Sequence, residues 1–276
     1  MNRKLLKENA KLALKQNFWL VMLVVLVAQF LGVADIGVAS SGGGSYSGSS
    51  SYEDSNWDFD DFDDEQKGIV AAVAALSVAV IIVIVLIAFV VAWVIAIFLT
   101  YPIKVGYRRF FMLNRINKGK FVDLFSSFCP KYMNIVKGMF TTNLRIFGWS
   151  LLFVIPGIIK GYQYFFVPFI LSENPDISGE RAREISTQMT DGHKWDIFVL
   201  WMSFFGWGLL AFLLSIPAAL LTCCLLGIGG YLVYTPLAGY IGATYAELYE
   251  ERREYALYNH LVSQEELCGY DNQKEA

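Results

Sequence analysis

The sequence predicts an all-α protein built as a polytopic membrane helical bundle, with six transmembrane helices in three hairpins and amphipathic helices at the interface. Residues 69–100 form an apolar run without a charged side chain, and about 20 such residues let a helix cross the hydrocarbon core. Hydrophobic residues make up 55% of the chain and charged residues 17%, whereas a soluble domain usually carries about 25% charged residues. The chain is therefore predicted to lie in a membrane.

Six apolar segments account for the predicted spans. They cover residues 18–38, 69–100, 140–155, 159–171, 197–221 and 225–245. The third and fourth are short and are separated by Pro156 and Gly157, which is compatible with a tight hairpin or with one broken helix. A hairpin is favoured because Pro and Gly stop a helix and permit a reversal. The first segment also resembles a secretory signal, but its apolar stretch is longer than a usual signal core, which favours a retained span.

Most of the positively charged side chains lie in four regions outside these segments. They precede the first segment, separate the second from the third and the fourth from the fifth, and follow the sixth. Residues 39–66 contain no Lys or Arg. Because Lys and Arg are enriched in cytoplasmic loops, six spans with both termini in the cytoplasm place every basic region on the same side.

Polar segments divide the chain into three parts. Residues 1–17 are a predicted basic interfacial helix, residues 18–249 the membrane domain, and residues 250–276 a polar cytoplasmic tail. Within the membrane domain, residues 39–66 combine Ser and Gly with acidic side chains. This composition buries too little apolar surface to fold, so a disordered outer loop is expected there.

The N-terminal helix is predicted to be amphipathic. One stripe carries Lys4, Lys7, Lys11 and Lys15, and another carries Leu6, Ala10 and Ala13. Such a helix lies in the interface with its lysines against anionic headgroups, which makes lipids of the cytoplasmic face the predicted partners. Residues 104–137 interleave basic with aromatic side chains, as nucleic-acid binding segments do. Beside a membrane this pattern favours an interfacial anchor, and no nucleic-acid partner is predicted.

Part of the chain repeats itself. Phe-Gly-Trp at residues 147–149 recurs at 205–207, and Gly-Tyr at 161–162 recurs at 230–231. These matches indicate hairpins repeated in the same orientation, which is a known way to build a membrane bundle. Coincidence among abundant apolar residues is the alternative explanation.

No catalytic motif is present in the sequence. The signatures of serine hydrolases, zinc peptidases, phosphate-binding loops and dinucleotide-binding folds are all missing. The acidic run at residues 58–64 lacks the glycine and the terminal glutamate of an EF-hand. The spacing of the cysteines fits neither a metal site nor a disulfide framework. They are Cys129, Cys223, Cys224 and Cys268. We therefore expect a protein that is not an enzyme and that holds no metal and no cofactor.

A few polar side chains at or near membrane depth are the candidate binding residues. They are Asn143, Arg145, Lys160, Gln163, His193 and Lys194. The first four form, in one interpretation, a polar seam that binds a ligand or a lipid headgroup, because polar groups at membrane depth are costly. In the other interpretation, the side chains of Arg145 and Lys160 only extend to opposite headgroup layers and bind no ligand. His193 and Lys194 are candidates for contact with phosphate headgroups.

Four motifs together resemble the signature of a bacterial membrane family, the one catalogued as domain of unknown function 975. They lie at residues 156–162, 173–179, 192–195 and 243–249. The resemblance implies a multi-pass protein of the cytoplasmic membrane, mainly in Gram-positive bacteria, and it implies no activity. A turn at Asn174-Pro175-Asp176 and a helix cap at Ser178 suggest that these motifs are structural.

Two functions remain open on this sequence. The first is a non-enzymatic membrane component that interacts with lipid, with protein partners or with further copies of itself. The alternative is a small transporter or exporter with a polar path between hairpins. A cavity lined by the four residues of the polar seam would favour transport, whereas tight helix packing at Gly148, Gly161, Gly206 and Gly230 would favour the first function.

Overall fold

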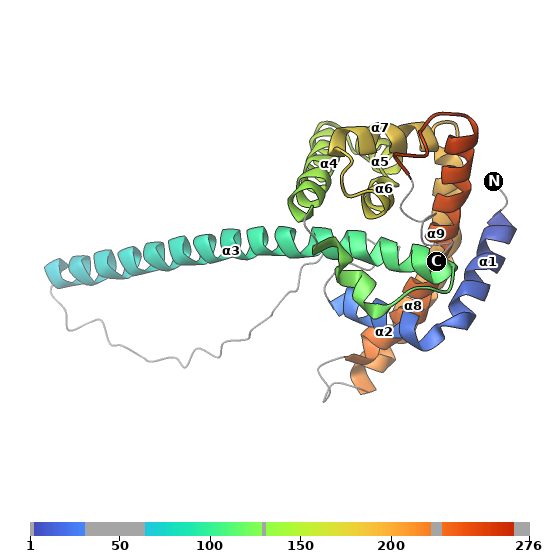
Figure 1. Ribbon diagram of the computed structural model, residues 1–276. Helices are drawn as coiled ribbons and strands as arrows, with labels where there is room; N and C mark the ends of the chain where they lie inside the picture. Colours follow the sequence, from blue (N-terminus) through green and yellow to red (C-terminus); the bar gives the residue numbers. More distant parts are fainter. Residues whose placement is uncertain (1–2, 31–63, 129–130, 222–227, 268–276) are drawn as a thin grey trace. The chain divides into compact units, whose positions relative to one another are not determined.

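The computed structural model describes residues 3–30, 64–128, 131–221 and 228–267, and the regular elements of this part of the chain are helices (Figure 1). They are α1 (Arg3–Gln16), α2 (Phe18–Phe30), α3 (Asp64–Arg115), the 3-10 helix η2 (Phe121–Phe128), α4 (Tyr132–Leu152), α5 (Val154–Gln163), α6 (Val167–Glu173), α7 (Gly179–Thr190), α8 (Lys194–Leu221) and α9 (Ile228–Tyr258). The all-α prediction is thus confirmed. Most of the predicted outer loop, the four cysteines and the end of the tail lie outside the described residues.

The chain divides into two units, residues 41–97 and the remainder. In the first unit, the described part of α3 is apolar and exposed along its length; Val85 is 60% and Ile87 59% exposed. An apolar helix with no polar side is typical of a membrane span. Within the described residues, Ala75–Arg115 is the longest candidate span.

The second unit is built around α9, against which α1, α2, α7 and α8 pack. Its core is rich in aromatic side chains, because α3, α6 and α9 each turn Phe or Tyr inward. Phe169 stacks on Tyr249 with 4.9 Å between ring centroids, and the ring of Phe166 lies 5.7 Å from that of Tyr249. Phe110 and Phe166 are fully buried. Aromatic pairs of this kind add to the stabilisation that burial alone provides.

Three helices of the described chain are long and apolar enough to cross a membrane. They are Ala75–Arg115, Val154–Glu173 and Lys194–Pro217, and α1 with α2, bent by 99°, makes a fourth if the pair counts as one span. The predicted six-span arrangement is therefore not confirmed. The predicted third and sixth spans correspond to α4 and α9, where charged side chains in α4 and Gly, Tyr and Thr in α9 reduce the apolar character of the helix.

The break between α4 and α5 falls at Phe153, whose backbone is extended with φ −153° and ψ 137°. Beyond it the chain returns along α4, so closely that a methyl group added at Gly157 would lie 2.1 Å from Ser150 Oγ. The sequence predicts the reversal at Pro156-Gly157, whereas in the structure it begins before these residues, at Phe153. Pro156 lies in the first turn of α5, and a helix tolerates proline there because the first amide groups have no intrahelical partner.

Candidate functional site

The outer face of α1 is the first candidate surface. Leu6, Ala10 and Ala13 are buried, and α1 packs on α9, so the predicted apolar stripe is the one that faces the protein. Lys4, Lys11 and Lys15 are exposed. Leu5 and Leu12 are 52% and 60% exposed. They lie about two helical turns apart and therefore on the same outer side of α1.

Lys7 departs from the predicted lysine stripe. Its Nζ donates a hydrogen bond of 2.8 Å to Ser203 Oγ and lies 4.8 Å from the centroid of the Phe204 ring. The cation is thus turned toward α8, where an aromatic face attracts it. Three lysines of α1, rather than four, remain available to a membrane surface.

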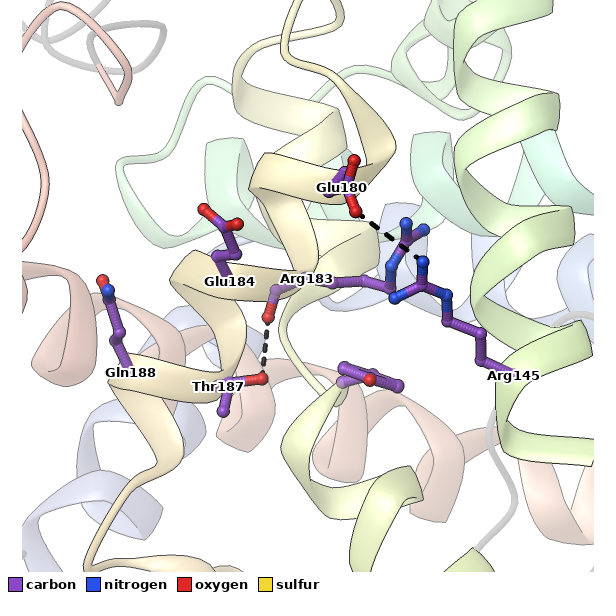
Figure 2. Close-up of a pocket in the computed structure, with 7 residues that line it drawn as sticks. Arg145, Glu180, Arg183, Glu184, Thr187 and Gln188 are labelled. Carbon is purple, nitrogen blue, oxygen red and sulfur yellow. Dashed lines mark hydrogen bonds and ion pairs between the residues drawn. The ribbon is translucent and has the colours of Figure 1, made fainter. Parts of the chain in front are cut away.

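A second candidate site is a cavity of about 320 Å³ between α4 and α7 (Figure 2). Its lining residues are Arg145, Tyr164, Glu180, Arg183, Glu184, Thr187 and Gln188. Figure 2 shows the guanidinium groups of Arg145 and Arg183 meeting from opposite helices, with Glu180 above them. We call this cavity the α4–α7 pocket.

Arg183 is only 6% exposed. Its Nη1 donates to Thr141 Oγ1 at 2.8 Å and approaches Thr142 Oγ1 at 3.5 Å, while its Nε is buried without a hydrogen-bond partner in the described structure. Burial first, and then the nearby charge of Arg145, lower the pKa of Arg183. A cation this deeply buried normally has an acidic partner, and no described carboxylate forms an ion pair with Arg183.

Arg145 is more accessible, with its side chain 52% exposed. Its Nη2 lies 3.7 Å from Glu180 Oε1, and the Glu180 side chain is 72% exposed. An ion pair this long and this open to water contributes little stability. Glu184 forms its own pair with Arg181, with 3.1 Å between Nη1 and Oε2.

A glycine contact brings α7 close enough to α4 for these side chains to meet. A methyl group at Gly179 would lie 2.6 Å from the Cα of Gly138. The start of α7 is fixed by Ser178, whose Oγ accepts a hydrogen bond from the Arg181 amide at 3.1 Å. The cap predicted from the sequence is therefore confirmed, and it defines the register in which Arg183 faces α4.

The structure brings three of the predicted binding residues to one region. Lys160 Nζ lies 5.7 Å from the Trp149 ring centroid and 5.8 Å from that of Tyr164, and Tyr164 also lines the pocket with Arg145. Lys160 and Arg145 thus both lie near Tyr164. The carbonyl of Gln163 accepts a hydrogen bond from Ser186 Oγ at 2.7 Å, which joins α5 to α7.

The other predicted residues lie outside the pocket. Asn143 is half-buried in α4 and does not line the cavity. His193 Nδ1 lies 3.2 Å from Asp196 Oδ2, and Lys194 Nζ lies 3.3 Å from Asp191 Oδ1. Both contacts lie at the start of α8.

The two structural indicators proposed from the sequence are not met where the described residues test them. Of the four residues in the predicted polar seam, only Arg145 lines the α4–α7 pocket, so this pocket is not the cavity expected of a transporter. A methyl group at Gly148, Gly161 or Gly206 would meet nothing within 4 Å. The expected close helix packing is therefore absent at these positions, and the side chain of Gly230 lies outside the described structure.

Sequence reasoning missed Arg183, which it counted only among the cytoplasmic charges. A signal was available, because Arg183 lies one position beyond Ala182 and two before Ile185, both buried residues of α7. A basic residue beside the buried stripe of a helix points partly inward. The identity of the α4 residue that Arg183 contacts, however, is set by the tertiary structure.

A further polar cluster joins α6 to α9. Glu173 accepts hydrogen bonds from Tyr249 Oη at 2.7 Å and from Arg253 Nε at 2.8 Å, and Arg253 Nη2 donates to the carbonyl of Leu267. These bonds connect two of the sequence motifs, at residues 173–179 and 243–249. Glu173 and Arg253 compensate each other, so this cluster has the properties of a structural contact.

Comparison with known proteins gives one match. A family model described as "Protein of unknown function (DUF975)" matches residues 62–256. No curated protein and no solved structure matches the chain significantly.

Proposed function

The chain belongs to the family described as protein of unknown function DUF975, and from its own geometry we propose a non-enzymatic membrane component that binds anionic lipid through α1. One observation carries the proposal: α1 buries its predicted apolar stripe on the protein and exposes Lys4, Lys11 and Lys15 together with Leu5 and Leu12. Exposed leucines beside lysines are the composition of a helix that lies in the membrane interface.

The bend between α1 and α2 supports this function. A change of direction of 99° is what a chain requires when an interfacial helix is followed by a span that enters the bilayer. Each lysine near an anionic surface contributes about 1 kcal/mol of attraction. Three exposed lysines therefore favour a leaflet rich in anionic lipid, and the Lys and Arg distribution places this leaflet on the cytoplasmic side.

The test uses the full chain with a polarity-sensitive fluorophore on Leu12→Cys, in a background without the native cysteines. In nanodiscs of phosphatidylcholine with increasing phosphatidylglycerol, we expect a blue shift that high salt reduces, because salt screens surface charge. A membrane-impermeant maleimide should label the same cysteine in inside-out vesicles and not in right-side-out vesicles.

Lys11→Gln and Lys7→Gln form a matched pair, because both remove one lysine of α1. Lys11→Gln should need more phosphatidylglycerol for a half-maximal shift, by roughly the fivefold weakening that about 1 kcal/mol represents. Lys7→Gln should change the response less, because Lys7 is engaged with Ser203 and Phe204. An identical emission in zwitterionic and anionic nanodiscs would refute the proposal.

A further inference from the structure

We propose that the α4–α7 pocket is a binding site for a phosphate-bearing anion, with Arg183 and Arg145 as its cationic ligands. This site is separate from the outer face of α1. The inference rests on a buried guanidinium without an ion pair to a described carboxylate. Arg183 is 6% exposed and faces a second guanidinium across the pocket (Figure 2), and the exposed Glu180 offsets its charge from a longer distance.

The burial of Arg183 is the first step of the argument. Removing an unpaired cation from water is costly, and proteins normally offset this cost with an acidic group. Arg253 illustrates the usual solution, because it is equally buried and its Nε lies 2.8 Å from Glu173 Oε1. Arg183 instead forms its hydrogen bonds with the neutral hydroxyls of Thr141 and Thr142, and Glu180 acts on its charge without forming an ion pair.

The second step is the neighbouring charge. The guanidinium of Arg145 lies beside that of Arg183 (Figure 2), and after burial its charge is the next cause that lowers the pKa of Arg183, so the two cations repel each other. Both the desolvation of Arg183 and this repulsion are relieved by one anion placed between them. A bound anion is therefore expected to stabilise the contact between α4 and α7.

The chemistry of the pocket identifies the class of anion. Guanidinium groups bind phosphate through paired, charge-assisted hydrogen bonds, and two of them arriving from different helices suit an anion with several oxygens. The volume of about 320 Å³ is at the lower end of small-molecule sites, and it exceeds what a bare phosphate fills. A phosphate carrying a small organic group, either a lipid headgroup or a soluble phosphate monoester, fits this space.

Glu180 is the natural competitor for this anion. It lies 3.7 Å from Arg145 and is 72% exposed, so it can turn into water when an anion enters. Removing its charge should therefore strengthen binding, an effect that a purely structural role of the arginines does not predict. Asp176 provides the matched control, because it lies outside the pocket lining and its carboxylate pairs with Lys131.

The test measures thermal unfolding of the purified full chain in a neutral detergent. One arm titrates inorganic phosphate and glycerol 1-phosphate against chloride at equal ionic strength, and the other adds phosphatidic acid against phosphatidylcholine. At least one phosphate-bearing ligand should raise the unfolding midpoint. A response to phosphatidic acid alone identifies a lipid headgroup, and a response to the soluble phosphates identifies a free monoester; both support the site.

Five variants decide whether the response comes from the pocket. Arg183→Gln and Arg145→Gln should weaken the apparent affinity by roughly tenfold to a hundredfold, the loss expected for a charge-assisted contact. Arg145 is half-exposed, so its variant keeps the test valid if Arg183→Gln fails to fold. Glu180→Gln should bind more tightly. Asp176→Asn and Lys131→Gln, which each remove one member of a surface ion pair outside the pocket, should respond as the wild type does.

Phosphate also stabilises proteins nonspecifically by exclusion from their surface, and this effect is the same in all variants. An equal response of Arg183→Gln, Arg145→Gln and Lys131→Gln would therefore overturn the proposal. So would a wild-type midpoint that no ligand of either arm changes. Because none of these variants touches the lysines of α1, a negative result here leaves the proposed function intact.

Discussion

Replacing Gly179 by Ala should separate α7 from α4. A methyl group at this position would lie 2.6 Å from the Cα of Gly138, about 0.8 Å short of the 3.4 Å at which ordinary contact begins. The obstacle is backbone, so no flexible side chain can yield. Overpacking of this kind usually costs about 1–3 kcal/mol, and the displacement also loosens the hydrogen bond between Arg183 and Thr141.

Gly148→Ala is the matched control for this prediction. Gly148 also lies on α4, and a methyl group there meets nothing within 4 Å. Alanine favours a helix over glycine by up to about 1 kcal/mol, so this variant should be neutral or more stable. The assay is the fraction of full chain that remains monodisperse in detergent after heating. A Gly179→Ala midpoint equal to that of Gly148→Ala would refute the geometry of the α4–α7 contact.

Two further predictions concern polar contacts, one between α7 and the segment that follows α9 and one between α6 and α9. Hydrogen bonds from Arg181 lower the pKa of Glu266, so the pair stabilises the fold above the unfolded-state pKa of about 4.5, and this stabilisation is lost as the pH falls through the lower folded-state value. The difference in unfolding midpoint between wild type and Arg181→Gln should therefore shrink from pH 6 to pH 3. A difference that stays constant over this range would contradict the assignment. Tyr249→Phe removes a hydroxyl from the buried Glu173 and should cost about 1–3 kcal/mol, measured against Tyr255→Phe at a position 46% exposed, which should be nearly silent.

Local patterns predicted the parts of this molecule that depend on local physics. The stripe of Leu6, Ala10 and Ala13 is buried as its spacing indicates, because side chains three and four residues apart share one face of a helix. Ser178 caps α7 because a side-chain acceptor before a helix satisfies a free amide.

Tertiary contacts explain where the sequence reasoning was insufficient. Arg183 and Thr141 are 42 residues apart in the sequence, and nothing in either segment identifies the other as its partner. Gly148 and Gly206 were expected at helix contacts because glycine permits close approach. In the structure the close approach occurs instead at Gly138 and Gly179, since contact also requires that the glycine faces another helix.

Hydrogen bonds of the loop before α7 fix the start of this helix on α4, which forms the other side of the pocket. Asn134 on α4 donates hydrogen bonds to the carbonyls of Pro175 and Ile177, at 2.7 and 2.8 Å. Asn174 accepts the Asp176 amide at 3.0 Å, which fixes the turn that precedes Ser178. These bonds tie the start of α7 to α4 without using either pocket arginine. An anion that enters the pocket therefore meets Arg183 on a helix whose start is already fixed and held by its hydrogen bond to Thr141, so little binding free energy is lost in ordering this side of the site.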